Sequence, residues 1–236
     1  MPNSDIAHRA HACAREAVKK FRSANKRTNF QRYISEDPAL ATRKMEDSAK
    51  NAKVDGVRHA QAALRLNSIR SSIDALEAKG LLSNLRSDLS LSAKLAERAR
   101  AGNCYEMTAL ALRYLNNNHD WHSGPTAMIS LTDGNHCFAV VGLEADDWDQ
   151  AELLVAKPLR DWGDDCYIID PWANVCCPAD QYELEFHCKM FSWSMKGKEI
   201  ATSVGEFENA TLMYQALKQC ERDLRLFQTE SDGVWN

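Results

Sequence analysis

The chain has 236 residues, of which 44% are hydrophobic and 26% charged, and this composition excludes a wholly disordered protein. Residues 1–100 carry a net charge of +9 and residues 101–236 a net charge of −13, which predicts two regions with different roles. Because acidic residues are interspersed among the basic ones of residues 1–100, the pattern does not indicate a nucleic-acid-binding surface.

The eight cysteines lack the regular spacing of a disulfide framework, so we expect a reducing working environment. The chain has no Cys-x-x-Cys pair, and no metal or other cofactor is predicted. The alternative is a metal site formed by Cys176, Cys177, His187 and Cys188, for which partly buried structural cysteines are the preferred interpretation.

The first twenty residues lack the apolar stretch of a cleaved secretory signal, and no segment is apolar enough to span a bilayer. We therefore expect a protein that is cytoplasmic when made. Export would have to use a machine that needs no cleaved signal peptide.

Residues 1–100 are predicted to be mainly helical. A first helical stripe comprises Ala10, Cys13, Ala14, Ala17, Val18 and Phe21, and a thinner one comprises Val57, Ala60 and Leu64. A third run, from Ile73 to Lys79, is expected to stop at Gly80, and Ser35–Pro38 is a predicted break. Many of the apolar residues are Ala, so this basic region is interpreted as a packing or docking element or a lobe of the following domain.

Residues 101–236 are predicted to hold helices and a short antiparallel sheet. A helix begins at Cys104, and two strands, PTAMISL and His136–Gly142, flank an Asp-Gly hairpin turn. After an acidic insert, CYIIDPW is a third strand. Helices are expected near Ala179–Met190 and from Phe207 to Phe227. The predicted fold class is α+β, with a small antiparallel sheet packed on a Cys-bearing helix and preceded by an all-helical region.

Three residues in this order suit thiol catalysis, which needs a nucleophile, a base and a group that orients the base. Cys104 lies at a helix start, where the helix dipole favours thiolate. His136 begins a buried strand. Asp170 ends the following apolar strand, where Pro171 keeps it extended, and we expect it to accept the Nδ1–H of His136. Asp164 or Asp165, in the acidic insert, is the alternative acid.

Neighbouring residues have predicted supporting roles. Trp172 is expected to screen the His–Asp pair from water, and the Cys104 backbone N–H is a candidate oxyanion donor. Asn103 is a candidate second donor. Asn103 and Glu106 also match a capping box, and we prefer capping to catalysis as the role of Glu106.

Three segments, GNCYEMTALA, NHCFAVVG and YIIDPW, together resemble the core of the papain-like/transglutaminase-like superfamily of cysteine enzymes. The nearest members are toxins and effectors that bacteria deliver into host or rival cells. The resemblance covers Gly102–Trp172 and implies that Cys104 is the nucleophile, His136 the general base and Asp170 the orienting acid. Papain-type proteases have a Gln shortly before the cysteine, whereas this chain reads AERARAGNC.

The resemblance implies a thiol-dependent acyl-transfer enzyme acting on protein amides: a cysteine protease, a glutamine deamidase or a transglutaminase. Its substrate would be a protein in another cell, with a reducing cytosol as the working site, and residues 1–100 would meet a chaperone or secretion machinery. The acidic second region suggests a basic or lysine-bearing partner. The alternatives are a non-catalytic adaptor that retains the fold and an enzyme of the arylamine N-acetyltransferase type.

Overall fold

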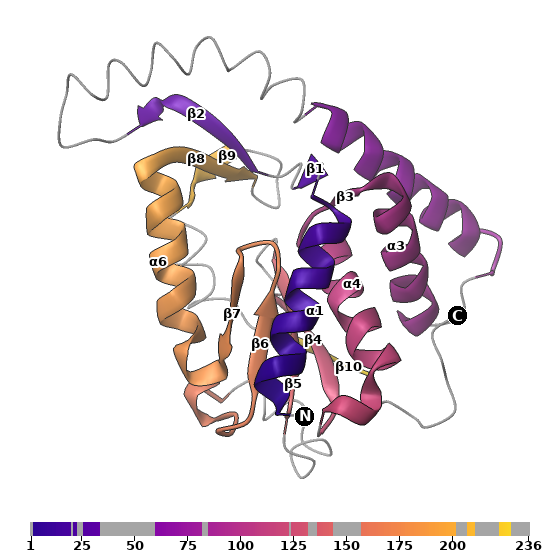
Figure 1. Ribbon diagram of the computed structural model, residues 1–236. Helices are drawn as coiled ribbons and strands as arrows, with labels where there is room; N and C mark the ends of the chain where they lie inside the picture. The colour runs from indigo at the N-terminus through magenta and orange to yellow at the C-terminus, as the bar shows by residue number, and fades with distance from the viewer. Residues whose placement is uncertain are drawn as a thin grey trace.

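The computed structural model describes residues 2–19, 21–22, 26–33, 60–81, 85–122, 124–131, 136–143, 157–201, 207–210 and 222–227 (Figure 1). The predicted break at Ser35–Pro38 and most of the acidic insert lie outside these residues. Within them the fold class is α+β, as predicted from the sequence.

A five-stranded antiparallel sheet forms the centre, with strand order β10-β4-β5-β6-β7. The strands are β4 (Thr126–Leu131), β5 (Cys137–Val141), β6 (Tyr167–Asp170), β7 (Val175–Pro178) and β10 (Arg222–Phe227). Every residue of β5 is buried, as the continuous apolar run predicts for a central strand. The predicted hairpin is confirmed by the pairing of β4 with β5, and its turn residues lie outside the described ones.

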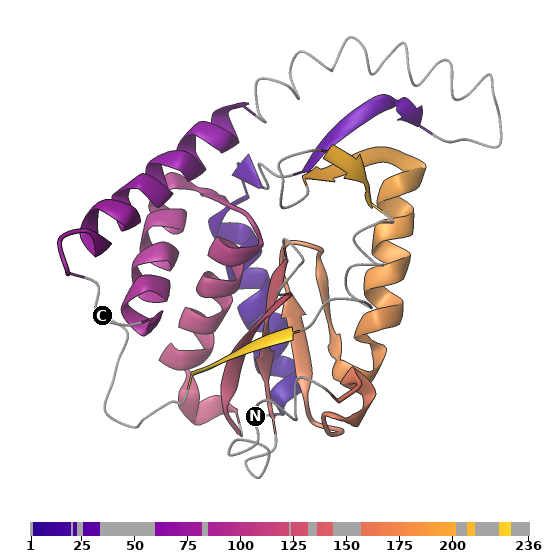
Figure 2. The same cartoon turned by 180° about the vertical axis from the view of Figure 1, so that it is seen from behind.

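The described helices include α1 (Asn3–Ala17), α3 (Leu85–Ala99), α4 (Cys104–Asn117) and α6 (Tyr182–Met195), of which α1, α4 and α6 contact the sheet. Helix α4 packs on β5 and β4, α1 packs on α4 and β6, and α3 packs on α4 (Figure 2). Helix α6 contacts the edge strand β7 and extends the helix predicted near Ala179–Met190. Short 3₁₀ turns cover His119–Trp121, Leu159–Asp161 and Ala179–Gln181.

One hydrophobic core contains side chains of α1, α3, α4 and the sheet, among them Ile6, Leu89, Leu110 and Phe138. Helices of residues 1–100 therefore bury apolar surface against the sheet that carries the predicted site. The division into a region of residues 1–100 and a domain of residues 101–236 stays a prediction, as does a docking or delivery role for the first region.

A smaller sheet, of order β2-β8-β9, comprises β2 (Lys26–Tyr33), β8 (Lys196–Ala201) and β9 (Phe207–Asn209). In addition, β1 (Phe21–Arg22) pairs in parallel with β3 (Ala101–Gly102). The prediction of an all-helical first region is therefore wrong at β1 and β2. The helix predicted from Phe207 to Phe227 is wrong at both ends, where β9 and β10 form. These strands are stabilised by partners distant in sequence, which helical periodicity does not detect.

The helix over residues 60–77 differs from its predicted stripe. Its buried residues are Ala62, Leu66, Ile69 and Ile73, whereas Leu64 is 69% exposed, so the predicted face is wrong. The predicted stop is confirmed: Gly80 has φ +67°, and its N–H donates to the carbonyl of Glu77.

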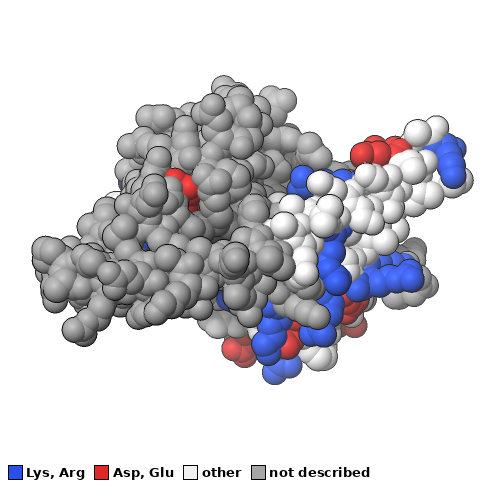
Figure 3. Space-filling model, turned by 90° about the horizontal axis from the view of Figure 1, so that it is seen from above, with Lys and Arg blue, Asp and Glu red and all other residues white. Residues whose placement is uncertain are grey.

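Seen from above, basic and acidic side chains are interspersed on the described surface (Figure 3). No helix of the described residues is long and apolar enough to cross a membrane.

Candidate active site

The antiparallel pairing of β5 with β6 brings His136 and Asp170 together. Ala139 pairs with Ile169, so the start of β5 lies beside the end of β6. Nε2 of His136 lies 2.8 Å from Oδ2 of Asp170, and both side chains are fully buried. The predicted contact is therefore present, but the prediction that Nδ1 faces the acid is wrong.

Asp170 receives three hydrogen-bond donors, which fix its carboxylate. Oδ2 accepts from His136 and from the hydroxyl of Tyr182 at 2.9 Å, and Oδ1 accepts from the backbone N–H of Ala173 at 2.9 Å. The turn that supplies Ala173 is held from outside by Arg15 of α1, whose Nη1 donates to the carbonyl of Pro171 at 2.8 Å. Burial and then the charge of Asp170 raise the pKa of Tyr182, which keeps its hydroxyl a donor.

Cys104, the first residue of α4, is 6% exposed, and its side chain lies close enough to His136 and Cys137 for both to shift its pKa. The Cys137 hydrogen bond most strongly lowers the pKa of Cys104. Burial opposes this, but the hydrogen bond and charge of His136 add to it, and the pKa lies well below the ordinary 9.0. The lowered pKa favours the thiolate form of the sulfur.

His136 is held as an imidazolium by its two charged neighbours. Burial alone would lower its pKa, but the charge and hydrogen bond of Asp170, followed by those of Cys104, raise the pKa from 6.5 to about 10. Nε2 of His136 bonds Asp170, whereas Nδ1 is buried and has no hydrogen-bond partner among the described residues. The opposite directions of the two pKa shifts favour a thiolate at Cys104 and an imidazolium at His136.

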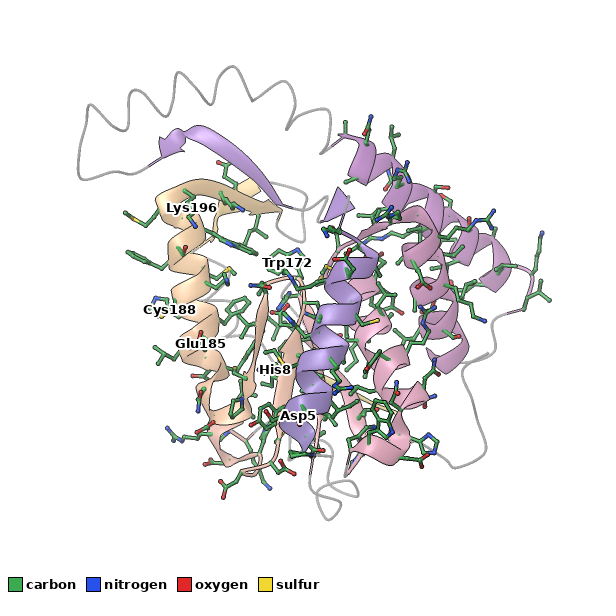
Figure 4. All side chains as sticks on the ribbon, viewed as in Figure 1. Asp5, His8, Trp172, Glu185, Cys188 and Lys196 are labelled. Carbon is green, nitrogen blue, oxygen red and sulfur yellow. The ribbon has the colours of Figure 1, made fainter. Side chains whose placement is uncertain are left out.

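Aromatic side chains enclose the imidazole. The ring centroids of Trp172 and Phe186 lie 5.0 Å and 5.3 Å from that of His136, and Trp193 meets Trp172 edge-on at 5.1 Å. Figure 4 shows Trp172 between α1 and α6. The position of Trp172, which is 2% exposed, suits the predicted screening of the His–Asp pair from water.

The first turn of α4 is closed by a capping box between Asn103 and Glu106. Oε2 of Glu106 accepts the backbone N–H of Asn103 at 2.9 Å, and Oε1 lies 3.3 Å from Nε of Arg70 on the helix over residues 60–77. These contacts suit the preferred capping role of Glu106. They also bind the side chain of Asn103 to the helix end.

The alternative acids lie elsewhere. Asp165 is exposed and accepts hydrogen bonds from Nδ2 of Asn3, at 3.1 Å, through both its carboxylate and its backbone carbonyl. Asp164 is also exposed. Asp170 is therefore the carboxylate that the structure places on His136.

A second cysteine–histidine pair lines a surface hollow of about 420 Å³ between α1, β7 and α6. Sγ of Cys176 lies 3.2 Å from Nδ1 of His8, but burial, followed by the charge of Cys177, raises the pKa of Cys176 to about 12. This thiol stays protonated at neutral pH, unlike Cys104. The described residues contain no group of three or more His, Cys, Asp or Glu side chains that could hold a metal. The alternative metal site of Cys176, Cys177, His187 and Cys188 is therefore not formed among them.

Two residues of the site were not predicted: Tyr182 and Cys137. Tyr182 begins a predicted helix, and the sequence gives no sign of where its hydroxyl points. Cys137 directly follows His136 in the sequence, and this adjacency is the signal that could have placed Cys137 in the site.

Comparison with protein-family models, curated proteins and solved structures gave no match. We therefore infer function from the site itself.

Proposed function

We propose that this protein is a thiol-dependent acyl-transfer enzyme that acts on protein amide groups. The observation that carries the proposal is the buried 2.8 Å contact of His136 with Asp170 together with the mutual pKa shifts of Cys104 and His136, the thiol pKa being lowered and the imidazole pKa raised. A buried thiolate–imidazolium pair carries a desolvation cost, and it is the state that nucleophilic cysteine catalysis requires.

The reaction would begin with attack of the Cys104 thiolate on an amide carbonyl carbon. Backbone N–H groups at the start of α4, that of Cys104 among them, would stabilise the developing oxyanion by about 3 kcal/mol. The protonated Nδ1 of His136 would then donate its proton to the leaving amine as the carbon–nitrogen bond breaks. The capping contacts of Asn103 leave the backbone donor as the better candidate.

The resulting thioester would be resolved by a second nucleophile. His136, now neutral, would take a proton from water or from a lysine amine as that group attacks the acyl carbon, and the Cys104 thiolate would leave. Asp170 would hold the imidazole and stabilise its cation in both halves of the reaction. Water gives hydrolysis or deamidation, and an amine gives cross-linking.

We further propose a papain-like/transglutaminase-like core. The features that support it are a cysteine on the first turn of a helix, the packing of that helix on an antiparallel sheet, and neighbouring strands that supply His and then Asp. Action as an effector in a host or rival cell belongs to the same proposal and depends on the sequence resemblance.

Access to the sulfur favours a slender substrate group. Cys104 is 6% and His136 3% exposed, with Trp172 and Trp193 alongside. The terminal amide of a glutamine side chain fits such a site better than a peptide bond within a folded chain, because an unbranched side chain can enter end-on. Deamidation or transglutamination is therefore the favoured outcome.

The experiment is mass analysis of lysate proteins after incubation with wild type, with Cys104→Ala, and with Cys188→Ala as a matched control at an exposed cysteine. An amide-to-acid mass change means deamidation, a new covalent adduct means cross-linking, and new fragments mean proteolysis. The change should appear with wild type and Cys188→Ala alone. Products that persist with Cys104→Ala would refute the proposal.

The second candidate is a non-catalytic adaptor, which the near-complete burial of Cys104 favours. The enzyme and the adaptor predict different rates of alkylation of the cysteines by iodoacetamide. A catalytic thiolate should alkylate faster than the exposed Cys13 and Cys188 at neutral pH, because it is already deprotonated. Slower labelling of Cys104 than of Cys188 across the pH range would support the adaptor.

A further inference from the structure

The active site contains a second thiol. The side chains of Cys104 and Cys137 lie close enough to shift each other's pKa, and the two residues are 6% and 5% exposed. Thr108, one turn after Cys104 on α4, confirms this placement: its Oγ1 lies 3.8 Å from Sγ of Cys137 and donates to the Cys137 carbonyl at 3.3 Å.

This proximity follows from the fold. Side chains alternate along a strand, so Cys137 points to the opposite face of the sheet from Phe138. Phe138 meets Tyr182 of α6, at a centroid distance of 4.8 Å, and Cys137 therefore faces α4 on the other side. The residue after the proposed base is thus directed under the first turn of the helix that begins with the proposed nucleophile.

We propose that Cys104 and Cys137 are a redox modification site, which a peroxide converts to a disulfide that reversibly blocks the nucleophile. The inhibitory consequence rests on the proposed function, whereas formation of the disulfide does not.

The chemistry takes two balanced steps. The Cys104 thiolate attacks one oxygen of hydrogen peroxide, a sulfur–oxygen bond forms as the oxygen–oxygen bond breaks, and hydroxide leaves and is protonated to water. The Cys137 sulfur then attacks the sulfenic sulfur of Cys104. A sulfur–sulfur bond forms, hydroxide leaves and takes the proton that Cys137 loses. In total two thiols are oxidised, and one peroxide is reduced to two waters.

The two thiols suit different steps. Cys104 is the thiolate and reacts first. The hydrogen bond with Cys104, followed by burial, raises the pKa of Cys137 well above 9.0, so Cys137 resists peroxide until Cys104 has been oxidised. Disulfide formation requires the two neighbouring sulfurs to close to about 2.05 Å. Peroxide is small enough for a nearly closed site, whereas larger oxidants are not.

The test is to treat the full chain with increasing hydrogen peroxide, block free thiols with N-ethylmaleimide, and map peptides by mass spectrometry without reduction. We expect a linked pair of peptides that contain Cys104 and Cys137 and are two hydrogens lighter than the reduced pair. Dithiothreitol should restore both thiols. The link should also form in Cys188→Ala and should be absent in Cys104→Ala.

Removal of the second thiol gives the sharper comparison. In Cys137→Ala, and equally in Cys137→Ser, oxidised Cys104 has no partner and should proceed to sulfinic acid, which dithiothreitol does not reverse. Agreement between the two variants would show that the result is not a folding defect of one of them, and circular dichroism would show that each variant is folded. Sulfinic acid at Cys104 of the wild type with no linked pair, or a link to a different cysteine, would overturn the proposal.

The outcome is separable from that of the proposed function. A linked pair in a protein that leaves all amides unchanged would refute the enzyme and support the disulfide. Amide chemistry that depends on Cys104, without a linked pair after peroxide, would support the enzyme and refute the disulfide.

Discussion

The hydroxyl of Tyr182 donates to Oδ2 of Asp170 at 2.9 Å, and both side chains are fully buried. The same carboxylate oxygen accepts from His136, whose Nε2 lies 3.4 Å from the Tyr182 oxygen. Because Tyr182 is the first residue of α6 and packs on Phe138 and Phe186, its ring has little freedom. Tyr182 therefore positions the carboxylate that orients the imidazole.

Tyr182→Phe should lower kcat by about 10- to 100-fold and leave KM unchanged, because it removes a hydrogen bond to a charged group worth about 1.5–3 kcal/mol without touching substrate. Steady-state kinetics on the substrate found by mass analysis would measure both constants. The matched control is Tyr114→Phe, on α4 three turns from Cys104, which should leave kcat unchanged. Equal losses in the two variants would contradict a positioning role for Tyr182.

Asp170→Asn should lower kcat by about 10²- to 10⁴-fold, because a neutral amide cannot stabilise the imidazolium. Without the Asp170 charge, burial would lower the pKa of His136, and at neutral pH the Cys104 thiolate would lose its cationic partner. Alkylation of Cys104 by iodoacetamide should therefore slow at pH 7 as well. Asp165→Asn, at an exposed acid bonded to Asn3, is the control and should alter neither rate.

The hairpin and the contact of His136 with Asp170 could be predicted because their signals are local. An Asp-Gly turn between two apolar runs specifies antiparallel neighbours, and a third apolar run pairs next to them. An antiparallel register then places the start of one strand beside the end of the next. That is all the proximity of His136 to Asp170 requires.

The remaining parts depend on contacts between distant segments. Strand β2 pairs with β8 across most of the chain, and β10 pairs with β4 across more than a third of it, so no local pattern revealed them. The approach of Nε2 rather than Nδ1 to Asp170 is a property of the packed imidazole, which lies against Trp172 and Phe186. Likewise, the role of Tyr182 depends on where α6 packs, which the helical pattern of Ala179–Met190 does not specify.

Glu106→Gln should retain activity, whereas Glu106→Ala should destabilise the protein by about 1–2 kcal/mol. The glutamine oxygen can still accept the backbone N–H of Asn103, and the lost ion pair is with Arg70, whose side chain is half exposed. Urea unfolding and kcat would be measured for both variants. A loss of kcat in Glu106→Gln as large as that in Asp170→Asn would show that Glu106 is catalytic.

The thiolate–imidazolium pair also predicts how the free energy of unfolding varies with pH. The pKa of His136 rises from 6.5 to about 10 on folding, so its contribution is complete below pH 6.5 and is lost as pH rises toward 10. The pKa of Cys104 falls from 9.0, so its contribution is complete above pH 9 and is lost as pH falls through the lowered value. Between pH 6.5 and 9 the folded and the unfolded pair each hold one proton.

Over that interval the pair should make no contribution to the pH dependence, since unfolding neither releases nor binds a proton there. Cys104→Ala removes the thiol that holds the proton in the unfolded protein, while Asp170 still favours the imidazolium of His136 in the folded protein. The stability of this variant should then fall above pH 6.5 relative to wild type, with a slope of up to about 1.4 kcal/mol per pH unit. Urea unfolding followed by tryptophan fluorescence between pH 6 and 9 would measure the difference, with Cys188→Ala expected to follow wild type. Parallel curves for wild type and Cys104→Ala would mean that the sulfur is a neutral thiol in the folded protein, and the pair on which the proposed chemistry depends would not exist.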